Sequence, residues 1–123
     1  MVRFGVLISG SGTNLQAVID AIAAGTLDAQ VPIVVSSRPD AYGIERARAA
    51  GIETLVLSRE TYADPRAADA RIVEALQRAG CDYVVMAGYM RKVTDAILDA
   101  FPDRVVNLHP ALLPAFKGAH AIQ

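Results

Sequence analysis

The sequence has 123 residues, of which 53% are hydrophobic and 20% are charged, and its formal net charge at pH 7 is −1. This composition fits one domain with a buried core, and it excludes global disorder and the strongly basic surface of a nucleic-acid-binding module. The single cysteine, Cys81, excludes an internal disulfide and a thiolate metal cluster, and no apolar run approaches the roughly 18 residues that span a bilayer. We therefore expect one cytoplasmic domain over residues 1–123, with no metal and no nucleic-acid or membrane partner.

The first elements show how the chain alternates. Residues 2–8 form an apolar run that predicts a buried parallel strand, and a segment rich in serine and glycine ends it. Apolar side chains then recur on one stripe of a helix that begins near Thr13. We expect Thr13 or Ser11 to cap this helix and Gly25 to end it.

The same alternation continues through the rest of the chain. Further strands are expected at residues 31–35, 53–57, 83–87 and 105–108, and further helices at residues 42–50, 65–79 and 94–100. Pro32 is expected at a first strand position or on an edge strand, and residues 58–65 at a polar connection. The order predicts an α/β fold, a Rossmann-like open parallel sheet with helices on both faces.

Ligands of open parallel sheets bind outside the carboxyl ends of the strands. Four polar or glycine-rich segments lie at such ends, at residues 9–14, 36–40, 88–92 and 107–114. Exposed connections are polar in any case, so each segment alone has a second explanation as a solvated loop. Their convergence at one edge nevertheless predicts an active site there.

Residues 9–14, SGSGTN, follow a strand and open a helix. Glycines let the backbone approach an anion, and the helix start offers free N–H groups, so a phosphate is the natural ligand. Asn14 stands in place of the third glycine of the dinucleotide fingerprint, and no acidic residue follows the second strand. The pattern therefore favours a phosphate monoester over a dinucleotide, with a plain tight turn as the alternative.

Two more segments carry candidate functional side chains. Alternation along the fifth strand places Asn107 and His109 on one side, where an amide could bind an oxyanion and an imidazole could move a proton. Residues 88–92 combine apolar and cationic side chains, which fits a planar ligand or a simple capping loop. Arg46 and Arg48 are expected on a solvated helix face, and Cys81 as a small buried filler rather than a nucleophile.

Four segments together resemble one known family. They read VLISGSGTNLQAVIDA (residues 6–21), AYGIERARAAGI (41–52), VVMAGYMRKV (84–93) and NLHPALLPAFKGAH (107–120). In order and spacing, the chain resembles the N-terminal part of the phosphoribosylglycinamide formyltransferases, the folate-dependent enzymes of purine biosynthesis. The resemblance implies a formyltransferase fold and transfer of a formyl group from 10-formyltetrahydrofolate to the amine of glycinamide ribonucleotide.

The resemblance also implies roles for particular residues. The substrate phosphate would be held by Gly12, Thr13 and Asn14, and the folate by Met90, Arg91, Lys92, Val93 and Asn107. Asn107 would also polarise the formyl carbonyl, and His109 would be the general acid–base group. The family places a folate-contacting arginine after the third strand, and a shift of one residue assigns it to Arg66, with Pro65 at the unshifted position.

The family continues beyond the last residue, with an aspartate that pairs with the catalytic histidine and more of the folate site. We therefore expect the chain alone to have little or no activity, and the missing C-terminal segment to act in trans as a partner. Two alternatives stay open: another 10-formyltetrahydrofolate enzyme, such as a hydrolase or a methionyl-tRNA formyltransferase, and an inactive phosphate-binding fragment. The GSGTN loop argues against the first alternative.

Overall fold

The computed structural model describes residues 1–108, in which five parallel strands form one sheet in the order β3-β2-β1-β4-β5. The strands are β1 (Val2–Ile8), β2 (Ala29–Ser36), β3 (Glu53–Val56), β4 (Tyr83–Ala87) and β5 (Val105–Leu108). The helices are α1 (Thr13–Ala23), α2 (Gly43–Ala49), α3 (Pro65–Arg78) and α4 (Asp95–Ala100), with a short 3-10 helix at Thr61–Ala63. The predicted open α/β sheet is confirmed.

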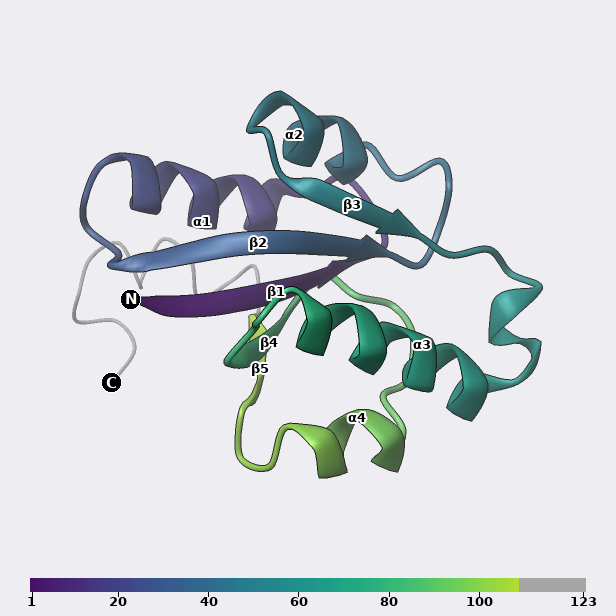
Figure 1. Ribbon diagram of the computed structural model, residues 1–123. Helices are drawn as coiled ribbons and strands as arrows, with labels where there is room; N and C mark the ends of the chain where they lie inside the picture. The colour runs from purple at the N-terminus through teal and green to yellow at the C-terminus, as the bar shows by residue number, and fades with distance from the viewer. Residues whose placement is uncertain (109–123) are drawn as a thin grey trace.

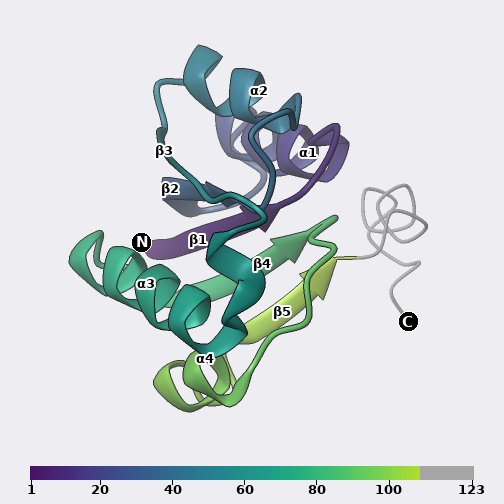
Figure 2. The ribbon, with the colours of Figure 1, turned by 90° about the vertical axis from the view of Figure 1, so that its right-hand side faces the viewer.

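Helices cover both faces of the sheet. Figure 1 shows α1 and α2 on one side and α3 and α4 on the other, and Figure 2 shows the same layers from the side. Side chains of β1 alternate between the two layers, since Val6 and Ile8 pack with α1 and α2 whereas Leu7 packs with α3 and α4. This two-sided burial explains why the strands read as nearly continuous apolar runs.

Pro32 lies inside the sheet, not at a strand end or on an edge strand as the sequence analysis expected. β2 begins at Ala29 and lies between β1 and β3. The missing N–H is tolerated because the β1–β2 register shifts between Arg3 and Gly5, opposite this proline, and because β3 pairs with β2 only from Ile33 onward.

The connection between β3 and α3 is more ordered than a polar linker. The 3-10 helix places Tyr62 in the core formed with α3 and α4. Asp64 then caps α3 by accepting a hydrogen bond from the Ala67 N–H, and Pro65 occupies the first turn as expected.

Among the described residues, no helix covers one part of the sheet on the α1 side. A groove of about 620 Å³ lies beside α1, and hydrophobic side chains of three strands dominate its lining, namely Val2, Phe4, Tyr83, Val85, Val106 and Leu108. Val106 on the edge strand β5 is correspondingly exposed. Within residues 1–108, no helix is long and apolar enough to cross a membrane.

Candidate functional site

The carboxyl ends of β1, β2 and β4 are joined by one serine. The buried hydroxyl of Ser9 is hydrogen-bonded to the Ser37 hydroxyl and accepts a hydrogen bond of 2.8 Å from the Met90 N–H. The Ser37 N–H in turn donates to the Ile8 carbonyl at 2.9 Å. These contacts, which we call the Ser9 junction, bring three of the four predicted loops together at one edge of the sheet.

The loop after β1, the GSGT loop (Gly10–Thr13), leads into α1. Gly12 is the residue that precedes the helix, with a left-handed φ of 77°, and no side chain of residues 1–108 caps the helix start. The expected cap by Thr13 or Ser11 is therefore wrong, because the left-handed turn that begins the helix requires a glycine. The first N–H groups of α1 are consequently left for another acceptor, which an anion can provide.

The three predicted phosphate-binding residues lie together at this helix start. Gly12 is buried, Thr13 is exposed, and Asn14 is 4% exposed. Gly12 also accepts the first helical hydrogen bond, from the Gln16 N–H at 2.8 Å. The structure thus groups these residues where the positive end of the α1 dipole lies.

The loop after β4 rests on a pair of tyrosines. Tyr89 is buried, and its hydroxyl is hydrogen-bonded to that of Tyr62 at 2.7 Å. Burial raises the pKa of both hydroxyls, and the bond to Tyr62 raises that of Tyr89 further, so both tyrosines are neutral at physiological pH. This buried pair supports the residues that follow Tyr89.

The predicted folate-binding residues come directly after Tyr89 in the sequence. Met90 is 81% exposed, and the Arg91 guanidinium lies over the Tyr62 ring, 4.3 Å from its centre. Lys92 is exposed, whereas Val93 is partly buried against the core. The loop ends at Thr94, whose N–H and hydroxyl both donate to the buried Asp69 carboxylate at 2.7 Å.

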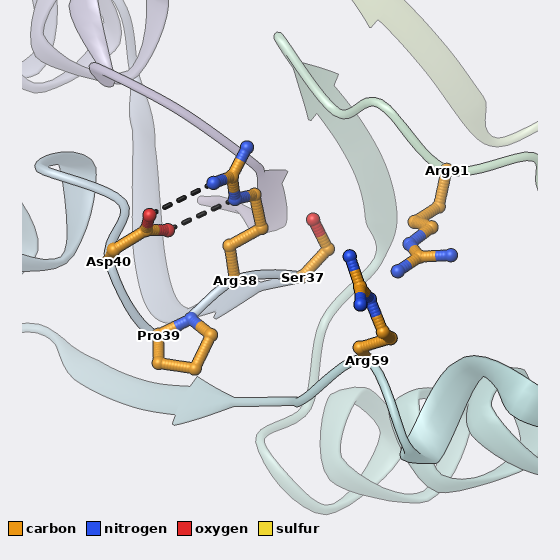
Figure 3. A pocket seen from close by; sticks show the side chains of 6 residues that line it. All are labelled: Ser37, Arg38, Pro39, Asp40, Arg59 and Arg91. Atoms are coloured by element: carbon orange, nitrogen blue, oxygen red, sulfur yellow. Dashed lines mark hydrogen bonds and ion pairs between the residues drawn. The ribbon is translucent and has the colours of Figure 1, made fainter.

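Beside Arg91 lies a cavity of about 470 Å³ that we call the arginine pocket. Its lining consists of Ser37, Arg38, Pro39, Asp40, Arg59 and Arg91. In Figure 3, Arg59 and Arg91 point into the same space from the loops after β3 and β4, while Arg38 pairs with Asp40 through two hydrogen bonds of 3.0 and 2.9 Å. Two guanidinium groups without a carboxylate partner among residues 1–108 therefore face this pocket.

Sequence reasoning missed Arg59. It follows Ser58 at the carboxyl end of β3, in the segment that was interpreted as a polar connection. Arg66, which the family pattern suggested, is exposed in the first turn of α3 and is not among the residues that line the arginine pocket. The position of Arg59 after a parallel strand was the signal that could have indicated it.

Asn107 lies next to the other loops. It is exposed on β5 and pairs in register with Met86, two residues before the β4 loop begins. Leu108 packs on the α1 side of the sheet and Val105 on the α3 side, so alternation directs Asn107 to the α3 side. His109 lies outside the described residues, and among residues 1–108 no three His, Cys, Asp or Glu side chains form a group that could hold a metal ion.

Comparisons with known proteins show the family of the chain. The formyl transferase family model matches residues 2–123, so the chain belongs to the formyl transferase family. Phosphoribosylglycinamide formyltransferase of Haemophilus influenzae is 39% identical over all 123 residues, which span 58% of that protein. The relative of this name in Escherichia coli is 41% identical over 115 residues, or 94% of the chain and 54% of the relative.

Solved structures give the same result. The crystal structure of glycinamide ribonucleotide transformylase 1 from Symbiobacterium toebii superposes with a TM-score of 0.85 at 52% identity, over 94% of this chain and 55% of that one. That of the Geobacillus kaustophilus enzyme gives 0.86 at 42% identity, over 99% and 65%. The resemblance noted in the sequence is confirmed, and the chain spans little more than half the length of the two curated relatives named above.

Proposed function

We propose that residues 1–123 form the N-terminal domain of a phosphoribosylglycinamide formyltransferase. The reaction is transfer of the formyl group of 10-formyltetrahydrofolate to the amine of glycinamide ribonucleotide. The observation that carries this proposal is the Ser9 junction, which holds the GSGT loop beside the β4 loop at the carboxyl edge of the sheet. Two substrates bound on these adjacent loops would have their reacting ends close together.

The phosphate of the ribonucleotide is assigned to Gly12, Thr13 and Asn14. In support of this assignment, α1 has no side-chain cap within the described part of the chain, and its first N–H groups and positive dipole end suit an anion. The ligand would be held mainly by the main chain, which requires the left-handed Gly12.

The folate is assigned to Met90, Arg91, Lys92 and Val93, with Asn107 beside them. Exposed Met90 offers apolar contact to a planar ring, while a folate also carries the carboxylates of its glutamate. We assign these carboxylates to Arg59 and Arg91 in the arginine pocket, because guanidinium groups bind carboxylates through paired hydrogen bonds. Arg59 thus takes the role that the family pattern suggested for Arg66.

The chemistry follows from an attack on the formyl carbon. The amine of the ribonucleotide forms the new C–N bond, and a tetrahedral oxyanion develops on the formyl oxygen. The Asn107 amide donates a hydrogen bond to this oxyanion, together with protonated His109. As the bond to the folate nitrogen breaks, protonated His109 donates its proton to that nitrogen, and the neutral imidazole then accepts the proton that the attacking amine loses.

A formyl-transfer assay tests this proposal. The chain is incubated with glycinamide ribonucleotide and 10-formyltetrahydrofolate, alone and then with the C-terminal part of a relative added in trans. We expect turnover only in the second mixture. A folded chain that shows no turnover in either mixture and does not bind the ribonucleotide would contradict the proposal.

Asn107→Ala in the active mixture should then lower kcat by roughly 10²–10³, since that is the typical cost of losing one oxyanion donor. Val106→Ala is the matched control, because Val106 is the adjacent exposed residue of β5 but lines the groove on the α1 side. A kcat for Asn107→Ala within about twofold of wild type would remove Asn107 from the proposed mechanism.

A further inference from the structure

Arg46 crosses from α2 to the GSGT loop, although the two are far apart in the sequence. Its Nε–H donates a hydrogen bond of 2.7 Å to the Ser11 carbonyl, and its Nη1 donates a longer one of 3.4 Å to the Gln16 side chain. The guanidinium also lies over the Tyr42 ring, 5.1 Å from its centre. These contacts fix the group at the start of α1, whereas the sequence analysis expected it on a solvated helix face.

The backbone of α2 is docked onto the same loop. The Gly43 N–H donates to the Gly10 carbonyl at 3.0 Å, and a Cβ atom on Gly12 would lie 2.5 Å from the Gly43 Cα. This close approach of two glycines keeps α2 in place, so Arg46 starts from a fixed position. The carbonyls of Gly10 and Ser11 are thus both bound by α2.

Binding these carbonyls orients the N–H groups that follow them. In a trans peptide the C=O of one residue and the N–H of the next point in opposite directions. When Arg46 holds the Ser11 carbonyl toward α2, the Gly12 N–H points away from α2. Arg46 therefore sets the direction of the Gly12 N–H, while its own side chain lies on the opposite side of the peptide.

The charge of Arg46 has no carboxylate partner among residues 1–108. The ion pairs formed within residues 1–108 do not include it, whereas Arg48 on the same helix pairs with Glu45 at 3.5 Å. The Arg46 charge therefore adds to the positive potential at the start of α1, whereas the charge of Arg48 is exposed and lies beside the Glu45 carboxylate.

We propose that Arg46 is a positioning residue for the substrate phosphate. It acts through the Ser11–Gly12 peptide, which it holds with the Gly12 N–H directed toward the anion. The inference rests on the proposed function, because it requires the phosphate at Gly12, Thr13 and Asn14.

Titration of this chain with inorganic phosphate tests the inference. Binding is followed at constant ionic strength by the amide NMR signals of Gly12, Thr13 and Asn14. We expect Arg46→Gln to weaken phosphate binding about tenfold and to shift the Gly12 amide signal even without phosphate. Arg48→Gln removes the same charge from the same helix, and it should bind within about twofold of wild type.

Arg46→Lys separates geometry from charge and serves if Arg46→Gln fails to fold. A lysine keeps the charge but cannot bond the Ser11 and Gln16 oxygens with the planar fork of arginine, so it should recover only part of the affinity. Wild-type affinity in Arg46→Gln or in Arg46→Lys would overturn the positioning role, and so would an equal loss in Arg48→Gln. If the amide signals of Gly12, Thr13 and Asn14 in the wild-type chain do not shift when phosphate is added, the proposed function itself is contradicted.

Discussion

The loops after β1 and β4 lie side by side at the sheet edge, yet different parts of the residues determine their shapes. The GSGT loop is shaped by its main chain, through a left-handed glycine and the close approach of Gly43. The β4 loop is shaped by side chains, through the buried pair of Tyr62 and Tyr89 and the Arg91 group above it. The main-chain loop leaves no room for an added Cβ at Gly12, whereas a loop shaped by side chains can lose one group and keep its shape. This difference suits the ligands proposed above, a small anion at the first loop and a large, flexible folate at the second.

The largest effect is expected for Gly12→Ala, which changes the loop that the main chain shapes. The new Cβ would lie 2.5 Å from the Gly43 Cα, and the residue would have to keep a φ of 77°. We expect the free energy of unfolding to fall by about 2–3 kcal/mol, measured by urea denaturation, and phosphate binding to be lost.

Gly10→Ala is the matched control in the same loop. A Cβ there meets no atom of residues 1–108 within 4 Å, and the residue has no left-handed φ. Its stability should change by less than about 0.5 kcal/mol. Equal losses for the two alanines would show that the loop is not specified by its glycine geometry.

Removing one hydroxyl from the tyrosine pair should have a smaller effect. Tyr89→Phe leaves the buried Tyr62 hydroxyl without its partner, so we expect a loss of about 1–2 kcal/mol in the free energy of unfolding. The double variant with Tyr62→Phe leaves no unpaired group and should be more stable than the sum of the two single changes predicts. A double-mutant cycle by urea denaturation measures this coupling, and strict additivity would mean that the hydroxyl pair does not support the loop.

The smallest expected effect concerns pH. Burial raises the pKa of Tyr62 and Tyr89, so the folded protein holds these protons more tightly than the unfolded chain, whose tyrosines titrate near pH 10. Their contribution to stability is complete below about pH 10 and is lost as the pH rises above that value.

Tyrosinate absorbance should therefore show a late-titrating component in the wild type that is absent from the double phenylalanine variant. That variant should also lose less stability between pH 8 and pH 10.5. A wild-type titration identical to that of the variant would contradict the burial of this pair.

The fold was largely readable from the sequence because each strand is a short apolar run and each helix has its own periodic stripe. The bounds of β1, β4 and β5 agree with the expected ones, and those of the other elements differ by a few residues at most. Pro32 could not be placed from local pattern, because its tolerance depends on how β1 and β3 pair around it. Tyr62 was missed because its burial depends on a partner 27 residues away.

The site was readable to a lesser extent. Glycine-rich and polar segments after strands indicated three loops that the Ser9 junction joins, because parallel strands end at one edge. The positions of the Arg46 and Arg59 side chains could not be predicted, because Arg46 binds a carbonyl before α1 and Arg59 lines a pocket shared with the loops after β2 and β4. Local sequence specifies where a side chain starts but not where a long, flexible one ends.

The position of β1 in the middle of the sheet affects the order in which the chain can fold. β1 pairs with β2, which follows it after a single helix, and also with β4, which is much further along the chain. The Ser9 hydroxyl accepts its hydrogen bond from the N–H of Met90, 81 residues later. Contacts of such separation close late, because they require a long loop of chain to be ordered first. During synthesis, the GSGT loop and α2 can therefore assemble early, whereas the junction with the β4 loop forms only after Met90 has emerged.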